Sequence, residues 1–136
     1  MNRDEIEVGG IFHLNLTRDD DMIIPDKEKN SLPKFIVIVG FVENVKYESV
    51  YCVISTLAYE PKDEQFPILK SSYPKFKEKQ SNLDLSRVRI MKVDRIVNSA
   101  KYIDTLTDED KKLILEHLRQ SEFFSNKEKK LYGWIE

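Results

Sequence analysis

The feature that most constrains the fold of this chain is an apolar run without polar alternation, Phe35 to Val39, in the segment KNSLPKFIVIVGF. A strand with one solvated face alternates apolar and polar side chains, so this run predicts a central strand that is buried on both faces. Pro33 ends whatever structure precedes it, and Lys34 follows directly. We therefore expect Lys34 at the mouth of a buried strand, either as a solvated end residue or as a functional cation.

Other strand patterns surround this run. The segment 11–16 alternates and places His13 on its more polar side, and the run 50–57 pairs with the central strand as a hairpin through the turn ENVKYE. A long acidic loop separates the first two strands. Pro67 in QFPIL predicts an edge strand, and residues 71–84 are expected to form a loop.

Residues 85–97, LSRVRIMKVDRIV, are predicted as the last strand system of the β part. The apolar residues change from one side of this strand to the other between Ile90 and Met91. A β-bulge at that point would reconcile the two halves.

The C-terminal part is predicted to be helical. Thr107 followed by three acidic residues is typical of a helix N-terminus, and Leu113 belongs to the apolar stripe of this helix. Ser125 and Glu128 have capping-box spacing, which predicts a short second helix. The tail that follows contains Trp134 and is apolar enough to pack on the sheet of its own chain or on another subunit.

Five or so short strands followed by a helix indicate an α+β, mostly β fold. We expect a small SH3-like β-barrel, or a strongly bent antiparallel sheet, with a C-terminal helix. The length of 136 residues favours a single domain over residues 1–136. Within it we place the barrel at about 8–97, the helix at about 107–121 and a C-terminal extension at 122–136.

Composition excludes several classes of protein. The charged fraction of 34% and the lack of a long apolar run argue against a membrane span, and the N-terminus has no apolar signal core, so we expect a cytoplasmic protein. Cys52 is the one cysteine and lies in a strand-like run, which indicates a buried small hydrophobe. With only His13 and His117 besides, no metal site and no cofactor are expected.

The charges are unevenly distributed along the chain. Basic residues strongly outnumber acidic ones between positions 70 and 101, whereas acidic residues dominate the first thirty positions. Tyr73 and Phe76 lie among these bases, a pattern that fits a footprint for single-stranded RNA with a stacking surface. A solvated loop and strand edge would give the same pattern, and both interpretations stay open.

One segment resembles a known family. Residues 85–118, LSRVRIMKVDRIVNSAKYIDTLTDEDKKLILEHL, resemble the PemK/MazF family of toxin endoribonucleases, with the similarity in element order extending over most of residues 8 to 120. Members typically carry a Ser at a strand start, a basic-Thr-Ile type step, a short basic connection, Ile-x-x-Leu and an acidic helix start. The matching positions in this chain are Ser86, Arg95-Ile96, Lys101, Ile103 to Leu106 and Thr107 to Asp110.

The resemblance implies metal-independent cleavage of single-stranded RNA through attack of the ribose 2′-hydroxyl. The family usually introduces its second strand with Arg-Pro and ends the next strand in a hydroxyl-bearing step. This chain has Pro33-Lys34 and then Ser55-Thr56, similar to the Pro-Lys and Thr-Ser steps of type III toxins. Lys34, Ser55 and Thr56 are therefore the candidate catalytic residues. The first strand begins Gly9-Gly10, where the family usually has Gly-Asp.

Further residues are candidates for holding the RNA, because their side chains carry positive charge or titrate near neutrality. They are Arg18, His13, Lys75, Lys77, Arg87 and Arg89. The family implies a homodimer neutralised by an antitoxin, either protein or RNA. The alternative is an inactive barrel that serves as an RNA-binding or protein-interaction module, and a third is an unrelated regulator whose acidic loop is its working surface.

Overall fold

In the computed structural model, strand β2 (Ser31–Phe41) runs through the middle of a curled antiparallel sheet, and both of its faces are covered. Val37 and Val39 pack into one hydrophobic core, whereas Ile36 and Ile38 pack into a second one. Two cores on one strand explain the apolar run without alternation, because neither face of the strand meets water.

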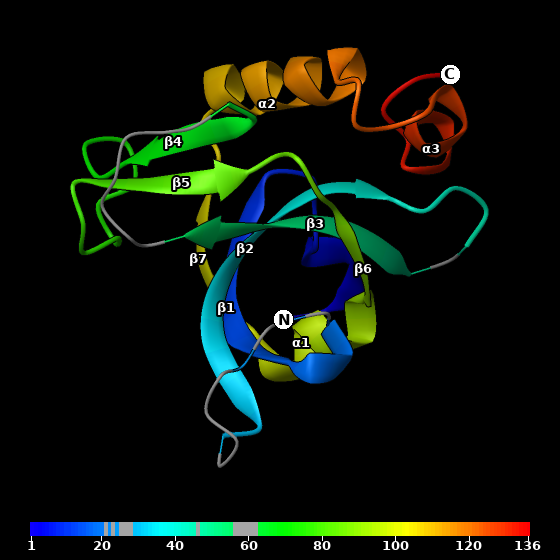
Figure 1. Ribbon diagram of the computed structural model, residues 1–136. Coiled ribbons are helices and arrows are strands. Elements are labelled where there is room, and N and C mark those ends of the chain that lie inside the picture. The colour runs from blue at the N-terminus through cyan, green and yellow to red at the C-terminus, as the bar shows by residue number, and fades with distance from the viewer. Residues whose placement is uncertain (21, 23, 25–28, 46, 56–62) are drawn as a thin grey trace.

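The structure describes residues 1–20, 22, 24, 29–45, 47–55 and 63–136. Neighbouring strands follow the order β4-β5-β3-β2-β1-β7, with β6 paired to β3, and the sheet curls into a half-barrel (Figure 1). This confirms the predicted mostly β, α+β fold with a C-terminal helix. Besides β2, the elements are η1 (Arg3–Glu5), β1 (Gly10–Thr17), η2 (Arg18–Asp20), β3 (Glu48–Ser55), β4 (Gln65–Leu69), β5 (Gln80–Asp84), β6 (Arg89–Lys92), α1 (Val93–Ser99), β7 (Lys101–Thr105), α2 (Asp108–Gln120) and α3 (Asn126–Leu131).

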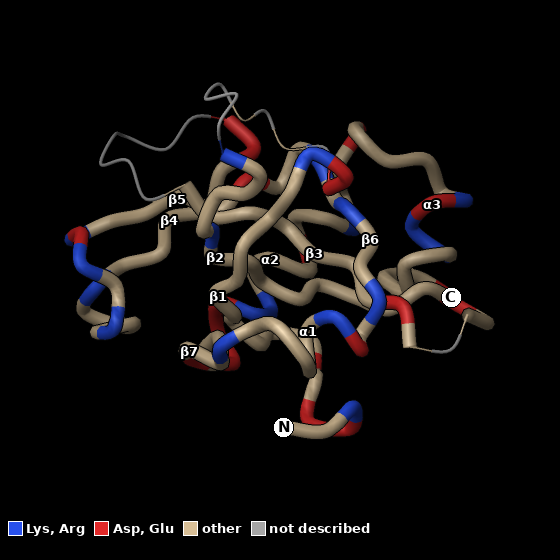
Figure 2. The backbone as a smooth tube through the Cα atoms, turned by 90° about the horizontal axis from the view of Figure 1, so that it is seen from below, with Lys and Arg blue, Asp and Glu red and all other residues tan. Residues whose placement is uncertain are grey.

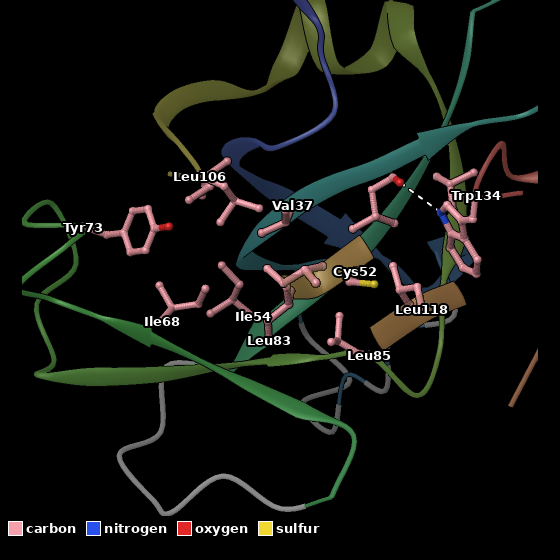
Figure 3. Close-up of a cluster of buried hydrophobic side chains, with 14 of the residues drawn as sticks. Val37, Cys52, Ile54, Ile68, Tyr73, Leu83, Leu85, Leu106, Leu118 and Trp134 are labelled. Atoms are coloured by element: carbon pink, nitrogen blue, oxygen red, sulfur yellow. Dashed lines mark hydrogen bonds between the residues drawn. The ribbon is translucent and has the colours of Figure 1, made fainter. Parts of the chain in front are cut away.

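The two cores define two faces of the sheet. The α1 face carries Ile36 and Ile38 and is covered by helix α1 through Val93 and Ile96. The α2 face is covered by helix α2 and the C-terminal tail, as the close-up of that core shows (Figure 3). Cys52 lies in the α2-face core, and burial raises the pKa of its thiol, so its predicted role as a small hydrophobe is confirmed.

The C-terminal tail packs on the sheet of its own chain. Trp134 is 4% exposed and donates a hydrogen bond from Nε1 to the carbonyl oxygen of Val39 at 3.0 Å (Figure 3). The tail passes over Gly40, where a Cβ would collide with the carbonyl oxygen of Tyr132. Only glycine allows this approach of backbone to backbone.

Lys34 does not lie at the mouth of its strand. β1 pairs with the first part of β2, from Thr17 with Ser31 to Ile11 with Val37, so Lys34 sits inside β2 opposite Leu14. The prediction was wrong because Pro33 was taken as a strand boundary. A proline can occupy a strand where one side lacks a partner, and the pairing of β2 with β3 starts only at Phe35.

The segment 85–97 is strand only over β6, and α1 follows as a helix. Val93 and Ile96 are both buried at helical spacing, which favours the helix. The bulge predicted between Ile90 and Met91 is absent from the β3–β6 pairing, and the register instead shifts in β1 and in β2. Strand β7, which the sequence analysis missed, follows α1 and pairs with β1.

Helices α2 and α3 begin where their capping residues predicted. The Thr107 side chain accepts a hydrogen bond from the backbone of Asp110 at the start of α2, and Ser125 forms a complete capping box at the start of α3. The apolar stripe of α2 differs from the prediction, because Leu113 is 50% exposed and Leu115 packs against the core in its place.

Candidate functional site

Lys34 and Ser55 are brought together on the α1 face. The β2–β3 pairing ends at Phe35 with Ile54, so the next residues along this register are Lys34 and Ser55. Ser55 in turn pairs with Asn82 of β5. Adjacent strands lie about 4.8 Å apart, so these residues form a row about 10 Å wide across three strands. We call Lys34, Ser55 and Asn82 the polar row.

Strand β5 contributes residues to this region that the sequence analysis missed. Gln80, Asn82 and Asp84 lie on one side of the strand and alternate with Ser81 and Leu83 on the other. Asn82 is fully buried, and its Oδ1 accepts a hydrogen bond from Gln80 Nε2 at 3.2 Å. The alternation in QSNLDL was the signal for this strand, and it was overlooked because the whole segment 71–84 was read as a loop.

Asp84 supplies a carboxylate on the side of β5 that carries Asn82. Its Oδ1 accepts hydrogen bonds from the backbone nitrogen of Ser86 at 2.9 Å and from Ser86 Oγ at 2.6 Å. These bonds fix the carboxylate at the end of the strand, where it can serve as a proton acceptor.

Arg89 also lies on the α1 face, but farther along the sheet. It pairs with Tyr51, four residues from Ser55 on β3, which corresponds to about 13 Å. Arg89 lines a cavity of about 240 Å³ that Asp19 and Asp20 also border. Its Nε is buried and has no hydrogen-bond partner in the described part of the chain, so the guanidinium retains a donor for an anion. Arg87 precedes β6 and is exposed.

Asp20 does not compete for Arg89, because its carboxylate is paired with Arg95 of α1. Burial alone would raise the pKa of Asp20, but hydrogen bonds from Arg95 and from the backbone nitrogen of Thr17 outweigh it and hold the pKa below its usual range. This pair ties the segment after β1 to the helix that covers the α1 face.

Arg18 is not brought to the polar row. Its guanidinium donates to the carbonyl oxygens of Lys29 at 2.9 Å and Ile24 at 3.0 Å. These bonds hold the two ends of the connection between β1 and β2 together. Thr56, the second candidate hydroxyl, lies outside the described residues.

The other predicted RNA-binding residues lie on the opposite face. His13, Lys75 and Lys77 line one cavity on the α2 face, so the sheet separates them from Lys34. Lysines gather at the connection between β4 and β5, as the charge distribution shows (Figure 2). The candidate residues therefore form two groups, one on each face.

Tyr73 and Phe76 are not the exposed stacking residues that their place among the lysines suggested. They are 1% and 2% exposed, and both pack in the α2-face core. The Tyr73 hydroxyl donates to Asp110 Oδ2 at 2.6 Å and accepts from the backbone nitrogen of Thr107 at 3.1 Å. Burial, reinforced by the Asp110 carboxylate, raises the pKa of the Tyr73 phenol. Tyr102 of β7 is the exposed aromatic residue here, and it was missed.

Comparison with protein-family models and with curated proteins found no match for this sequence. In the part of the chain that the structure describes, no helix has the length and apolar character of a membrane span. The same residues contain no group of three or more His, Cys, Asp or Glu side chains placed to hold a metal ion.

Proposed function

We propose that this protein is a toxin-like endoribonuclease that cleaves single-stranded RNA at the polar row without a metal ion. The observation that carries the proposal is the placement of Lys34 beside Ser55 on one face, at the end of β3. A cation and a hydroxyl in adjacent positions provide two donors for one phosphate group. The resemblance of the chain to PemK/MazF toxins supports the same reaction.

In this reaction the ribose 2′-oxygen attacks the adjacent phosphorus, and the bond from phosphorus to the 5′-oxygen breaks. The products are a 2′,3′-cyclic phosphate and a 5′-hydroxyl group. The Lys34 ammonium stabilises the charge on the phosphorane oxygens, and the Ser55 hydroxyl orients the phosphate. Asp84 is the candidate acceptor for the 2′-hydroxyl proton, and the leaving 5′-oxygen takes up a proton from water.

Arg89 extends the proposed site along the RNA strand. It lies on the same face as the polar row, and its unpartnered Nε is available for a second phosphate. A row of cations along one face tracks a nucleic-acid backbone rather than one isolated anion. We further propose, from the resemblance, a cytoplasmic homodimer held inactive by a protein or RNA antitoxin.

One observation favours a second function, an inactive module that binds RNA or another protein. His13, the histidine of the β half, lies across the sheet from Lys34. Among the described residues, the α1 face therefore offers a carboxylate and no imidazole as proton acceptor near the row. If the Asp84 carboxylate is a poor acceptor for the 2′-hydroxyl proton, the protein would bind RNA without cleaving it.

Incubation of the purified chain with a labelled single-stranded RNA tests the first function. We expect cleavage in the presence of EDTA, with 2′,3′-cyclic phosphate ends on the products. Lys34→Ala should slow cleavage by about 100-fold and Ser55→Ala by a smaller factor, because each removes a donor to the phosphate. Lys92→Ala, at an exposed lysine of β6, is the matched control.

Wild-type protein that binds the RNA but leaves it intact would favour the inactive module. If Lys34→Ala cleaves the RNA at the wild-type rate, the polar row does not take part in the reaction. Expression in bacteria gives an independent readout, since growth arrest that Lys34→Ala relieves is expected of a toxin.

A further inference from the structure

A cavity of about 310 Å³ lies on the α2 face, at the same end of the sheet as the polar row. Its walls come from β1, β2 and β5 and from the connection between β4 and β5. The lining residues are His13, Phe35, Lys75, Phe76, Lys77, Glu78 and Ser81. A cavity of this size is at the lower end of the range for small-molecule sites.

Aromatic rings form one side of this cavity. The rings of His13 and Phe35 lie 4.7 Å apart at 61°, and those of Phe35 and Phe76 lie 4.6 Å apart at 43°. Phe76 is almost fully buried, so the partly exposed rings of His13 and Phe35 provide the accessible part of this aromatic surface. Such a surface favours a flat ring as its ligand, because stacking on an aromatic group is available to every nucleobase.

Ser81 marks the cavity as a place for a polar ligand. It is fully buried, and its Oγ has no hydrogen-bond partner among the described residues. Buried hydroxyl groups in folded proteins nearly always find a partner, so an orphaned one beside a cavity indicates that a bound molecule supplies it.

The charge at the cavity indicates an anion. Lys75 and Lys77 line it with a single carboxylate, that of Glu78. Lys75 Nζ is held by the carbonyl oxygen of Ile103 at 2.7 Å, close to the ring of Tyr102. That bond uses one of three protons on the ammonium group and leaves the others for a ligand.

We propose that this cavity binds a nucleoside phosphate, with the base against the aromatic surface, Ser81 on a polar atom of the base or sugar, and the lysines on the phosphate. The ligand is either a free mononucleotide or one nucleotide unit of an RNA strand. The assignment does not depend on cleavage at the polar row, which lies on the other face.

Calorimetric titration of the full chain with AMP, GMP, CMP and UMP tests the proposal. We expect at least one of them to bind, and inorganic phosphate or the corresponding nucleoside to bind more weakly. Ser81→Ala should weaken binding by about fivefold, the effect of one hydrogen bond. Lys77→Gln should weaken it as well, whereas Glu78→Gln should strengthen it by removing the competing carboxylate.

Two controls separate this site from other effects. Ser49→Ala removes a buried serine hydroxyl that donates to Met91 on the α1 face, and it should leave binding unchanged. Lys92→Ala, at an exposed lysine of β6 that lies outside both sites, should also leave binding unchanged. An uncleavable 2′-O-methyl RNA oligonucleotide distinguishes the two sources of the ligand by competition, since it displaces a bound mononucleotide from a site for RNA units and not from a site for free nucleotides.

Two results would overturn the assignment. One is that none of the mononucleotides and no RNA oligonucleotide binds, or that inorganic phosphate alone binds as tightly as the nucleotides. The other is that binding occurs with the same affinity in Ser81→Ala and Lys77→Gln.

Discussion

The two faces of the sheet carry different chemistry at the same end of the molecule. On the α1 face, Lys34 and Ser55 lie side by side next to the interior core. On the α2 face, the neighbouring residue Phe35 joins His13 in an aromatic cavity rimmed by lysines. Successive residues of a strand point to opposite sides, so the pleat alone separates the two groups.

The two faces are also closed by different means. Helix α1, which lies between β6 and β7 in the sequence, covers the α1 face. The Asp20–Arg95 ion pair fastens this helix to the segment after β1. The α2 face is covered by α2 and by the distant tail, whose Trp134 is bound to Val39. This difference predicts that the two faces respond to different substitutions.

The largest expected effect is on the α2 face. Trp134→Ala removes a buried indole and leaves the Val39 carbonyl without its donor, so the free energy of unfolding should fall by about 3–5 kcal/mol in urea titrations. Leu131→Ala, at an exposed position of the same tail, should cost less than about 1 kcal/mol. Equal losses in the two variants would contradict the role of the tail as a cover for this core.

A smaller effect is expected on the α1 face, and it should depend on pH. Asp20→Asn should lower the free energy of unfolding by about 1–2 kcal/mol at pH 7. Because the pKa of Asp20 is depressed in the folded chain, this stabilisation is complete above the ordinary value of 3.8 and is lost as pH falls through the lower folded value.

Urea unfolding of both proteins at neutral and at acidic pH measures this difference. Wild type and Asp20→Asn should converge in stability once the pH has fallen below the folded pKa of Asp20. Asp19→Asn, at the exposed neighbour of Asp20, should change stability by no more than about 0.5 kcal/mol at either pH. A pH-independent gap between wild type and Asp20→Asn would show that the carboxylate charge is not what fastens the α1 face.

The smallest effects on stability are expected when one buried serine hydroxyl is removed from each face. Ser49 Oγ donates to the Met91 carbonyl oxygen at 2.8 Å, so Ser49→Ala should destabilise the fold by about 1 kcal/mol. Ser81 Oγ has no partner in the described structure, so Ser81→Ala should leave stability within about 0.5 kcal/mol of wild type or raise it. A clear loss of thermal stability in Ser81→Ala would mean that its hydroxyl serves the fold rather than a ligand.

The part of the fold that the sequence predicted is the part that depends on local pattern. The central strand, the edge strand at Pro67 and the caps at Thr107 and Ser125 each have a short-range signal, and the structure has them in place. Helix α1 and strand β7 were not foreseen. The segment that forms them is apolar at spacings that fit a strand or a helix, and tertiary contacts with the α1-face core decide between the two.

The candidate residues were named from the sequence, but their arrangement in space depends on the register and on tertiary packing. The proximity of Lys34 and Ser55 depends on the register of the β2–β3 hairpin, which shifts between Ile38 and Gly40 and so could not be read from the turn. The burial of Tyr73 and Phe76 was not readable, because it depends on the fold of a connection that local pattern does not determine. The separation of His13 from Lys34 required knowing which side of β1 faces which core.

Strand β2 serves both faces at once, and this shared use limits how the molecule can change over evolutionary time. A one-residue shift in the register of β2 alters the polar row and the aromatic cavity together. The connection between β4 and β5, which carries Lys75, Lys77 and Glu78, lines the cavity and contributes no residue to the polar row. New ligand preferences on the α2 face can therefore arise in that connection while the α1 face is inherited unchanged.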